Sequence, residues 1–435
     1  MKRRRRFELF GIVAIAALNT GCETHAQPLV GLQGDAEVVI EWNQILQANI
    51  PASAGLFSFR YYAMMHIAMF DAINSIEGGY DRYHVRIPAA GAASAQAAAA
   101  QAAHDVLAAL IANEQSRAAF AAALASRLAT LHPPHAAQGA AVGQKVAQAV
   151  LDWRTNDGTE QPNVAYLPPA LPGLWQSAPV PAGQPPQVAA FVQFANVEPF
   201  ALLTPTQYLP RRPPLLSSAE YAADLEQVKS LGSTISVTRT DEQTLLARLF
   251  AAVNYGPGPF ALWSHVARDV SRSQRLSLIQ TARLFAMLSV AMHDGLQTAH
   301  TSKFVYGLWR PVTAIRRADE DLNDLTAPDL TWSPLLGTPP YPSHSSNLTC
   351  IGASAARALE RVLGSDAVPF ALTWTGTNGS ANVTRQYMTF SQLAEEAGLS
   401  RVYGGIHFLF ELTVSHESCR KVADYAADHY MLRTD

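Results

Sequence analysis

The stretch from Gln161 to Leu216 contains clustered prolines, in "YLPPALPGLWQSAPVPAGQPP" and "YLPRRPPLL". Proline lacks the amide hydrogen that a helix needs and clashes with the preceding turn, so regular helix is excluded over most of this stretch. On both sides of it apolar residues recur at helical spacing, and no strand-like alternation persists along the chain. The pattern predicts an all-α protein of two packed helix bundles, residues 27–160 and 217–435, joined by a long proline-rich connection over residues 161–216.

The composition is that of a compact globular protein. Of the 435 residues, 49% are apolar and 15% are charged, and the formal net charge is −3. No basic helix or tail follows the first residues, so we expect no nucleic-acid partner.

The N-terminal residues 1–26 have the architecture of an export signal. A basic run from Lys2 to Arg6 precedes an apolar stretch that is too short to span a bilayer, and small residues follow up to Ala26. We therefore predict an exported, periplasmic or secreted protein with no transmembrane segment in the mature chain. Two variants stay open: twin-arginine export, from the arginine run, and a lipid anchor at Cys22.

Two cysteines, Cys350 and Cys419, remain after the predicted cleavage. In an oxidising compartment they can form a disulfide, and otherwise they are two buried thiols; the sequence leaves both readings open. Two cysteines are in either case too few for a disulfide-dependent fold.

Three short stretches of the second helical group carry the residues that can do chemistry. In "KFVYGLWRP", Lys303 and Arg310 are two helical turns apart, so both are expected to project from one face of a helix. In "TPPYPSHSSNLTC", hydroxyl residues precede a helix, whose N-terminus offers free N–H groups to an anion. In "SRVYGGIHF", Arg401 and His407 flank a Gly-Gly bend that can turn both side chains toward one point.

Each feature alone has an ordinary structural explanation: a pair of cations is usually a solvated helix face, and a lone histidine is usually a core residue. Together they predict a site for a tetrahedral or trigonal-bipyramidal oxyanion. Guanidinium groups bind pairs of oxygens, a lysine adds a point charge, and a histidine can bond to the central atom.

The motifs K-x6-R-P, P-S-G-H and S-R-x5-H form the signature of the superfamily that joins vanadium-dependent haloperoxidases and type 2 phosphatidic acid phosphatases. The chain resembles its bacterial haloperoxidase-like branch from about Val38 to about Ala426, in flanks such as "YGLWRPVTAIRRAD" and "NVEPFALLTPTQYLP". The first and third motifs are intact. The resemblance implies a helical-bundle fold and a vanadate cofactor, with phosphate able to occupy the same site.

In this branch His407 would be the apical ligand of vanadium and would act in catalysis with Arg401. The vanadate oxygens would be held by residues of all three motifs: Lys303, Arg310, Ser346, Asn347 and Arg401. Glu411 stands four residues after His407, where the family commonly has an aspartate that orients this histidine. Asp294, upstream of the first motif, is expected to orient one of the arginines.

The middle motif is not intact, and two registers compete for it. The ungapped register, which we favour, places Ser346 at the anion-binding serine and Asn347 at the glycine. The other register needs a deletion and uses Ser343. The family's second histidine is replaced by Leu348 in the first register and by Ser345 in the second.

The missing histidine handles proton transfer in the haloperoxidases and protonates the leaving oxygen in the phosphatases. A positioned proton donor is worth roughly 10²–10⁴-fold in rate. His344, two residues before Ser346, is our candidate catalytic substitute, with His300 as the second candidate and His293 as a weaker one. The alternative is that these histidines are ordinary polar residues at a pocket rim.

Three functions are compatible with these residues. The resemblance favours a haloperoxidase that oxidises halide with hydrogen peroxide. A soluble acid phosphatase would use the same pocket, with His407 attacking a phosphomonoester. An oxyanion-binding protein of impaired catalysis would follow from the lost histidine. A homodimer is a further expectation from the family.

Overall fold

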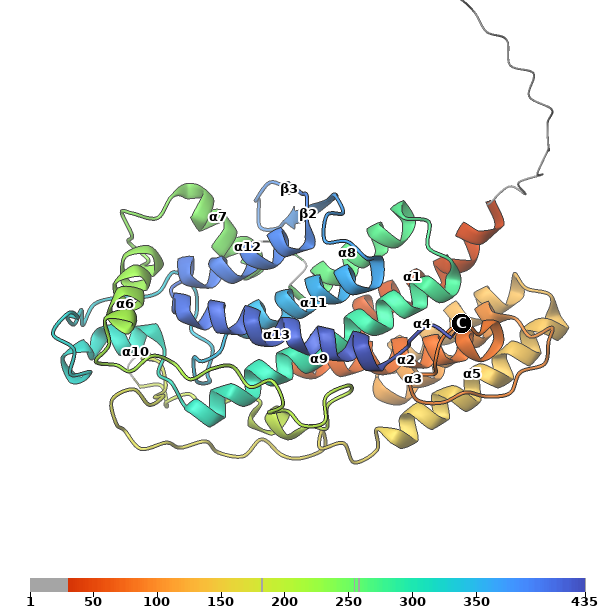
Figure 1. Ribbon diagram of the computed structural model, residues 1–435, viewed down its shortest axis with the longest axis horizontal. Helices are drawn as coiled ribbons and strands as arrows, with labels where there is room; N and C mark the ends of the chain where they lie inside the picture. Colours follow the sequence, from red (N-terminus) through yellow and green to blue (C-terminus); the bar gives the residue numbers. More distant parts are fainter. Residues whose placement is uncertain (1–29, 181–182, 254, 257–258, 435) are drawn as a thin grey trace, which may run out of the picture.

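The computed structural model describes residues 30–180, 183–253, 255–256 and 259–434. The predicted export signal and Cys22 lie outside these residues. The described part is mostly helical and forms an elongated molecule (Figure 1), so the predicted all-α fold class is confirmed. No described helix has both the length and the apolar character needed to cross a membrane.

The first helical group comes from the sequence before the proline-rich connection. It contains α1 (Val30–Asn49), η1 (Ala52–Phe57), α2 (Ser58–Glu77), α3 (Ala95–Leu110), α4 (Glu114–Ala129) and α5 (Pro133–Trp153). The alanine-rich tract forms α3 and α4, as expected from the high helix propensity of alanine. Helix α3 packs against α2, α4 and α5, and its alanines allow these helices to approach closely.

The connection that follows contains η2 (Val192–Asn196) and runs along one edge of the molecule to α6 (Figure 1). It is tied to the core by Asp294, whose carboxylate accepts the amide hydrogens of residues 200–202 at 2.7–3.0 Å. The expectation that Asp294 orients a motif arginine is therefore wrong, because its oxygens are used by these amides.

The second helical group follows the connection. It contains α6 (Ala219–Gly232), α7 (Asp241–Phe250), α8 (Pro259–Ser273), α9 (Leu278–Tyr306), α10 (Pro311–Arg316), η3 (Ala318–Glu320), α11 (Asn347–Leu363), α12 (Phe390–Tyr403) and α13 (Leu409–His429). A capping box of Ser277 and Gln280 starts α9, which is buried along nearly its whole length. Because α9 packs against α1 and α2 on one side and α11 and α13 on another, one hydrophobic core extends through both groups. The predicted domain boundaries stay a prediction.

A small antiparallel sheet departs from the expectation that no strand alternation persists. It consists of β1 (Tyr255–Gly256), β2 (Phe370–Gly376) and β3 (Val383–Tyr387), in the order β1-β2-β3. Along β2 buried and exposed residues alternate, so Phe370, Leu372 and Trp374 face the core. The alternation spans only a few residues, which is too short to stand out in a helical sequence.

A disulfide joins Cys350 of α11 to Cys419 of α13, with a Cα–Cα distance of 5.2 Å. The structure thus decides between the two readings of these cysteines in favour of pairing. The bond fixes the two helices whose N-terminal ends carry the middle and third motifs.

We expect the double variant Cys350→Ser/Cys419→Ser to fold but to lose stability. The bond closes a loop of 69 residues, and the entropy it removes from the unfolded chain corresponds to up to about 4 kcal/mol. Urea unfolding of the oxidised wild type and of the variant measures the loss. The same comparison under reducing conditions is the control and should remove most of the difference; equal stability of the two oxidised proteins would contradict the prediction.

Candidate active site

The first motif is divided between two helices. Gly307, at φ 62°, ends α9, and Pro311 starts α10, so Lys303 lies in the last turn of α9 and Arg310 is the N-cap of α10. The expectation that both cations project from one face of a single helix is therefore wrong. The left-handed turn at Gly307 nevertheless brings the two side chains to the same buried place, where both contact Tyr341.

Lys303 is fully buried. Its ammonium donates to the main-chain carbonyls of Ser343, at 2.8 Å, and of Ser345. Burial, reinforced by the charge of Arg310, holds the pKa of Lys303 well below its ordinary value. The middle motif thus bends around the lysine with its carbonyls facing the ammonium group.

Arg310 is also fully buried. Its Nε donates to the carbonyl of Tyr341 at 2.8 Å, and its Nη1 donates to the carbonyl of Ile406 at 2.9 Å and to Nε2 of His407 at 3.2 Å. The remaining nitrogen, Nη2, is buried and has no hydrogen-bond partner among the described residues. A buried donor of this kind is costly unless a ligand accepts from it.

The third motif is brought to the same place by a bend at two glycines. Helix α12 ends at Tyr403, Gly405 has φ 75°, and α13 begins at Leu409. Gly405 also approaches Gly232 so closely that a Cβ on Gly232 would lie 2.4 Å from its Cα. The expected Gly-Gly bend is therefore present at Gly404–Gly405.

Arg401 and His407 are both buried at this bend. Burial lowers the pKa of Arg401 to about 10, against the opposing influence of Tyr341. Burial, together with the charges of Arg310, Lys303 and Arg401, lowers the pKa of His407 well below its ordinary value. His407 is therefore neutral at ordinary pH.

Glu411 fixes the tautomer of His407. Its Oε2 lies 2.7 Å from Nδ1 of His407 and also accepts from the Phe408 amide at 2.9 Å and from Oγ of Ser343 at 3.0 Å. Nδ1 therefore carries the ring proton, and Nε2, which accepts from Arg310, carries the lone pair. The glutamate thus reaches the histidine despite being one methylene longer than the family's aspartate.

The two candidate serines differ in their surroundings. Ser346 is the N-cap of α11, where its Oγ accepts from the Thr349 amide at 3.4 Å and from the Thr349 hydroxyl at 2.8 Å. These bonds leave the hydroxyl hydrogen of Ser346 for another acceptor. Ser343 instead donates its hydroxyl hydrogen to Glu411. This arrangement favours Ser346 and Asn347, the first residue of α11, as anion-binding residues.

Each of the two stronger candidate substitute histidines, His344 and His300, uses a ring nitrogen on a main-chain carbonyl, whereas Nδ1 of His293 lies 2.9 Å from the Asp294 carboxylate. Nε2 of His344 lies 2.8 Å from the carbonyl of Arg211, and Nε2 of His300 lies 3.0 Å from that of Phe191. Burial lowers the pKa of both, that of His300 to about 3. A neutral imidazole has one N–H, so both donors are already used. The predicted catalytic role of His344 stays a prediction.

Tyr341 is a site residue that the sequence reading missed. Lys303 Nζ lies 5.3 Å and Arg310 Cζ 5.1 Å from the centre of its ring. The only available signal was its place in "TPPYP", five residues before Ser346.

We call the residues that meet at this place the oxyanion cage: Lys303, Arg310, Ser346, Asn347, Arg401 and His407. Three of them are buried cations. Glu411 is close enough to influence the pKa of Lys303 and Arg310, but Arg401 has no carboxylate partner among the described residues. The cage therefore has an excess of positive charge in a buried place, which an anion between the cations would compensate.

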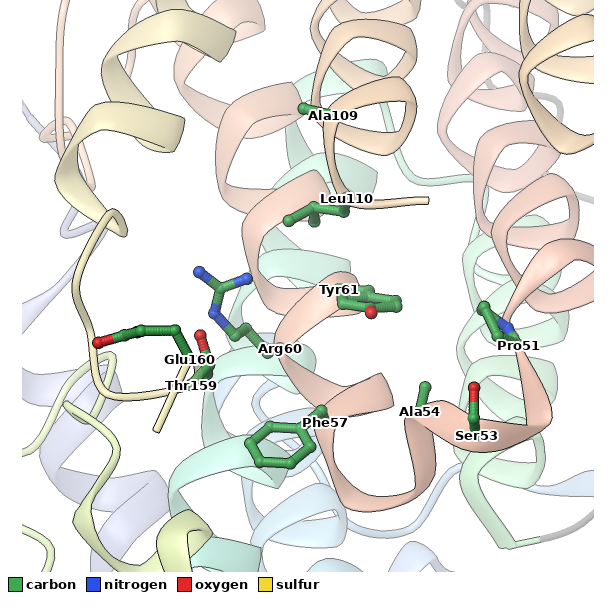
Figure 2. A pocket seen from close by; sticks show the side chains of 10 residues that line it. All are labelled: Pro51, Ser53, Ala54, Phe57, Arg60, Tyr61, Ala109, Leu110, Thr159 and Glu160. Atoms are coloured by element: carbon green, nitrogen blue, oxygen red, sulfur yellow. The ribbon is translucent and has the colours of Figure 1, made fainter. Parts of the chain in front are cut away.

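A separate open pocket of about 400 Å³ lies in the first helical group. Figure 2 shows Arg60, Thr159 and Glu160 on one side of it and Pro51 and Ser53 on the other. Arg60 is already bound to Asp157 at 2.6 Å. No cage residue lines this pocket.

Comparisons with known proteins agree with this geometry. Residues 283–435, which include the whole cage, match the family model described as the VCPO second helical-bundle domain. The chain is similar to a bacterial vanadium-dependent iodoperoxidase, with a TM-score of 0.76 and 21% identity over 93% of this chain and 98% of that one. It is also similar to a bacterial vanadium-dependent chloroperoxidase in its holo form, with a TM-score of 0.68 and 16% identity over 88% and 96% of the two chains. A comparison with curated proteins finds no significant match.

The fold is thus that of the bacterial vanadium haloperoxidases. Within it, residues 283–435 match the second helical bundle of the VCPO type, and the resemblance seen in the motifs is confirmed at this level.

The lowered pKa of Lys303 predicts how anion binding depends on pH. An anion in the cage raises the pKa of Lys303 again. At a pH between the pKa of Lys303 in the free protein and its pKa in the anion-bound protein, binding therefore takes up a proton. In this range the affinity falls as pH rises, by up to about tenfold per pH unit. Sulfate is a suitable probe because its charge is constant in this range, and calorimetry in buffers of different ionisation enthalpy measures the proton uptake.

Lys303→Met is the control for this prediction. This variant should bind sulfate more weakly and should lose the pH dependence that comes from Lys303. Any pH dependence that remains comes from other groups such as Glu411, whose pKa is raised by burial. Below about pH 9 Arg401 stays charged, since its pKa is lowered only to about 10. Sulfate binding to the wild type with no proton uptake would show that Lys303 does not titrate in this way.

Proposed function

We propose that this protein is an exported, vanadate-dependent haloperoxidase that oxidises a halide with hydrogen peroxide. The observation that carries the proposal is the oxyanion cage, in which three buried cations surround a neutral histidine with its lone pair directed at one of them. The shared fold with iodo- and chloroperoxidases supports the assignment.

The residues of the cage fit vanadate. The unpartnered Nη2 of Arg310 and the free hydroxyl hydrogen of Ser346 are donors without an acceptor, as an oxyanion site requires. Lys303 and Arg401 add charge, and the N-terminus of α11 at Asn347 adds main-chain N–H groups. Nε2 of His407 would be the ligand to vanadium, because Glu411 holds the proton on the other ring nitrogen.

When bound, vanadate would activate hydrogen peroxide for transfer of an oxygen atom to halide, giving hypohalous acid. The role of the cage residues is to neutralise and orient the anion. Lys303 and Arg310 are held by main-chain carbonyls, so their positions are fixed before an anion arrives. Burial of the cage keeps water away and strengthens each charged contact.

Export is part of the proposal. It rests on the signal-like N-terminus and is supported by the disulfide between Cys350 and Cys419, since such bonds persist in oxidising compartments.

A phosphatase is the second candidate, because Nε2 of the same neutral His407 carries the lone pair that a nucleophile toward a phosphomonoester needs. Leu348, at the place of the family's histidine, instead favours an oxyanion-binding protein of impaired catalysis. These two functions are outcomes of the test below.

Orthovanadate titration of the mature protein by calorimetry is the first test, with oxidation of iodide and bromide by peroxide assayed in parallel. We expect binding together with turnover, and we expect His407→Ala to abolish both because it removes the ligand to vanadium. Binding without halide oxidation would transfer the assignment to the phosphatase if a phosphomonoester is hydrolysed, and to the binding protein if it is not. No binding of vanadate or phosphate by the wild type would refute all three.

The register of the middle motif gives a further prediction. Ser346→Ala removes a hydroxyl hydrogen that is free to bind the anion. A hydrogen bond to a charged group is worth about 1.5–3 kcal/mol. The affinity for vanadate should therefore fall by about tenfold or more. Ser343→Ala is the matched control and should change the affinity less, because that hydroxyl donates to Glu411. The reverse order in a calorimetric titration would overturn the ungapped register.

A further inference from the structure

The oxyanion cage lacks the histidine that the family's second motif supplies, and the structure offers a different group in its place. The two stronger candidates for its replacement, His344 and His300, have no N–H that is free to donate to an anion. The N–H of His344 is used on the carbonyl of Arg211, and that of His300 on the carbonyl of Phe191, while Nδ1 of His300 lies 3.3 Å from the Asn347 side-chain nitrogen and accepts from it.

Tyr341 is a further polar residue near the middle motif whose side chain reaches the cage. Its hydroxyl donates no hydrogen bond to another described residue. Its ring lies over the ammonium of Lys303 and the guanidinium of Arg310, and it makes an edge contact with His300 at 5.2 Å between ring centres. Its main-chain carbonyl accepts from Arg310 at 2.8 Å, which fixes the residue at this place. Arg310, Arg401 and the Asn347 side chain are all close enough to influence the pKa of its hydroxyl.

Two cations and the Asn347 side chain influence this hydroxyl. The Asn347 side-chain nitrogen and the two guanidinium groups can only donate hydrogen bonds, and Oδ1 of Asn347, which can accept one, has no hydrogen-bond partner among the described residues. The Tyr341 hydroxyl donates to no acceptor among the described residues, so its hydrogen is available to an anion that enters the cage. The phenol group is buried while part of the residue remains exposed, so Tyr341 lies at the boundary between the cage and solvent.

We propose that the Tyr341 hydroxyl donates a hydrogen bond to the bound oxyanion and so takes the position of the missing second-motif histidine. This inference rests on the proposed function, because it requires that the cage binds an oxyanion. Burial raises the pKa of Tyr341 above its ordinary value despite the nearby arginines, so the phenol keeps its hydrogen over the whole working range of pH.

The test is a calorimetric titration of wild type, Tyr341→Phe and Tyr306→Phe with orthovanadate and, separately, with inorganic phosphate. Tyr341→Phe removes one oxygen atom and keeps the ring over the two cations, so we expect affinity for both anions to fall by about tenfold or more. Tyr306→Phe is the matched control, because its hydroxyl donates to the carbonyl of Pro210 at 2.7 Å and its ring contacts His344. It should bind both anions as the wild type does.

Each outcome decides the question. Wild-type affinity in Tyr341→Phe, or an equal loss in Tyr306→Phe, overturns the role of Tyr341 but leaves the proposed function in place. Failure of the wild type to bind either anion overturns the proposed function and this inference with it. A urea-unfolding curve shows whether Tyr341→Phe is folded.

A second pair of variants covers the case in which Tyr341→Phe does not fold. Tyr341→Gln keeps a side-chain N–H donor, and Tyr341→Met has a similar length without one. We expect the glutamine variant to bind phosphate more tightly than the methionine variant. Equal affinities for phosphate in this pair would overturn the proposal.

Discussion

Three buried cations that surround one histidine impose the main constraint on this structure. Lys303, Arg310 and Arg401 are removed from water, and charges in such a place are tolerated only when their hydrogens are bound and their charge is balanced. Lys303 and Arg310 meet the first need with main-chain carbonyls, and Tyr341 places the face of its ring against both. Glu411 balances part of the charge, and an oxyanion would balance the rest.

The helices around the cage are arranged so that their ends converge there. Helix α9 ends near Lys303, α11 begins after Ser346, and α12 and α13 meet at the bend between Arg401 and His407. Main-chain groups at helix ends are not used within the helix, so they can bind side chains and ligands at the site. Burial of α9 and the disulfide between α11 and α13 fix this convergence.

Much of the site was predictable because its chemistry is carried by residue types in short, fixed spacings. The cations, the histidine and the Gly-Gly bend all lie together as expected. Local geometry was less predictable. The two cations of the first motif are on separate helices because Gly307 adopts a left-handed conformation, and Asp294 binds main-chain amides of the connection because that segment folds back onto α9.

The sequence by itself determined the class of helical fold and the positively charged character of the site. Alanine-rich segments and apolar residues at helical spacing favour helices, and lysine, arginine and histidine in these short motifs suit an anion. Only the tertiary structure decided which donors are free. Whether a serine, a histidine or a tyrosine can serve an anion depends on what else its hydrogen bonds to. For Ser343, His344 and His300 the partners are Glu411 and the carbonyls of Arg211 and Phe191, all distant in the chain. Such long-range contacts leave no local pattern in the sequence, and so the free hydroxyls of Ser346 and Tyr341 become visible only in the folded molecule.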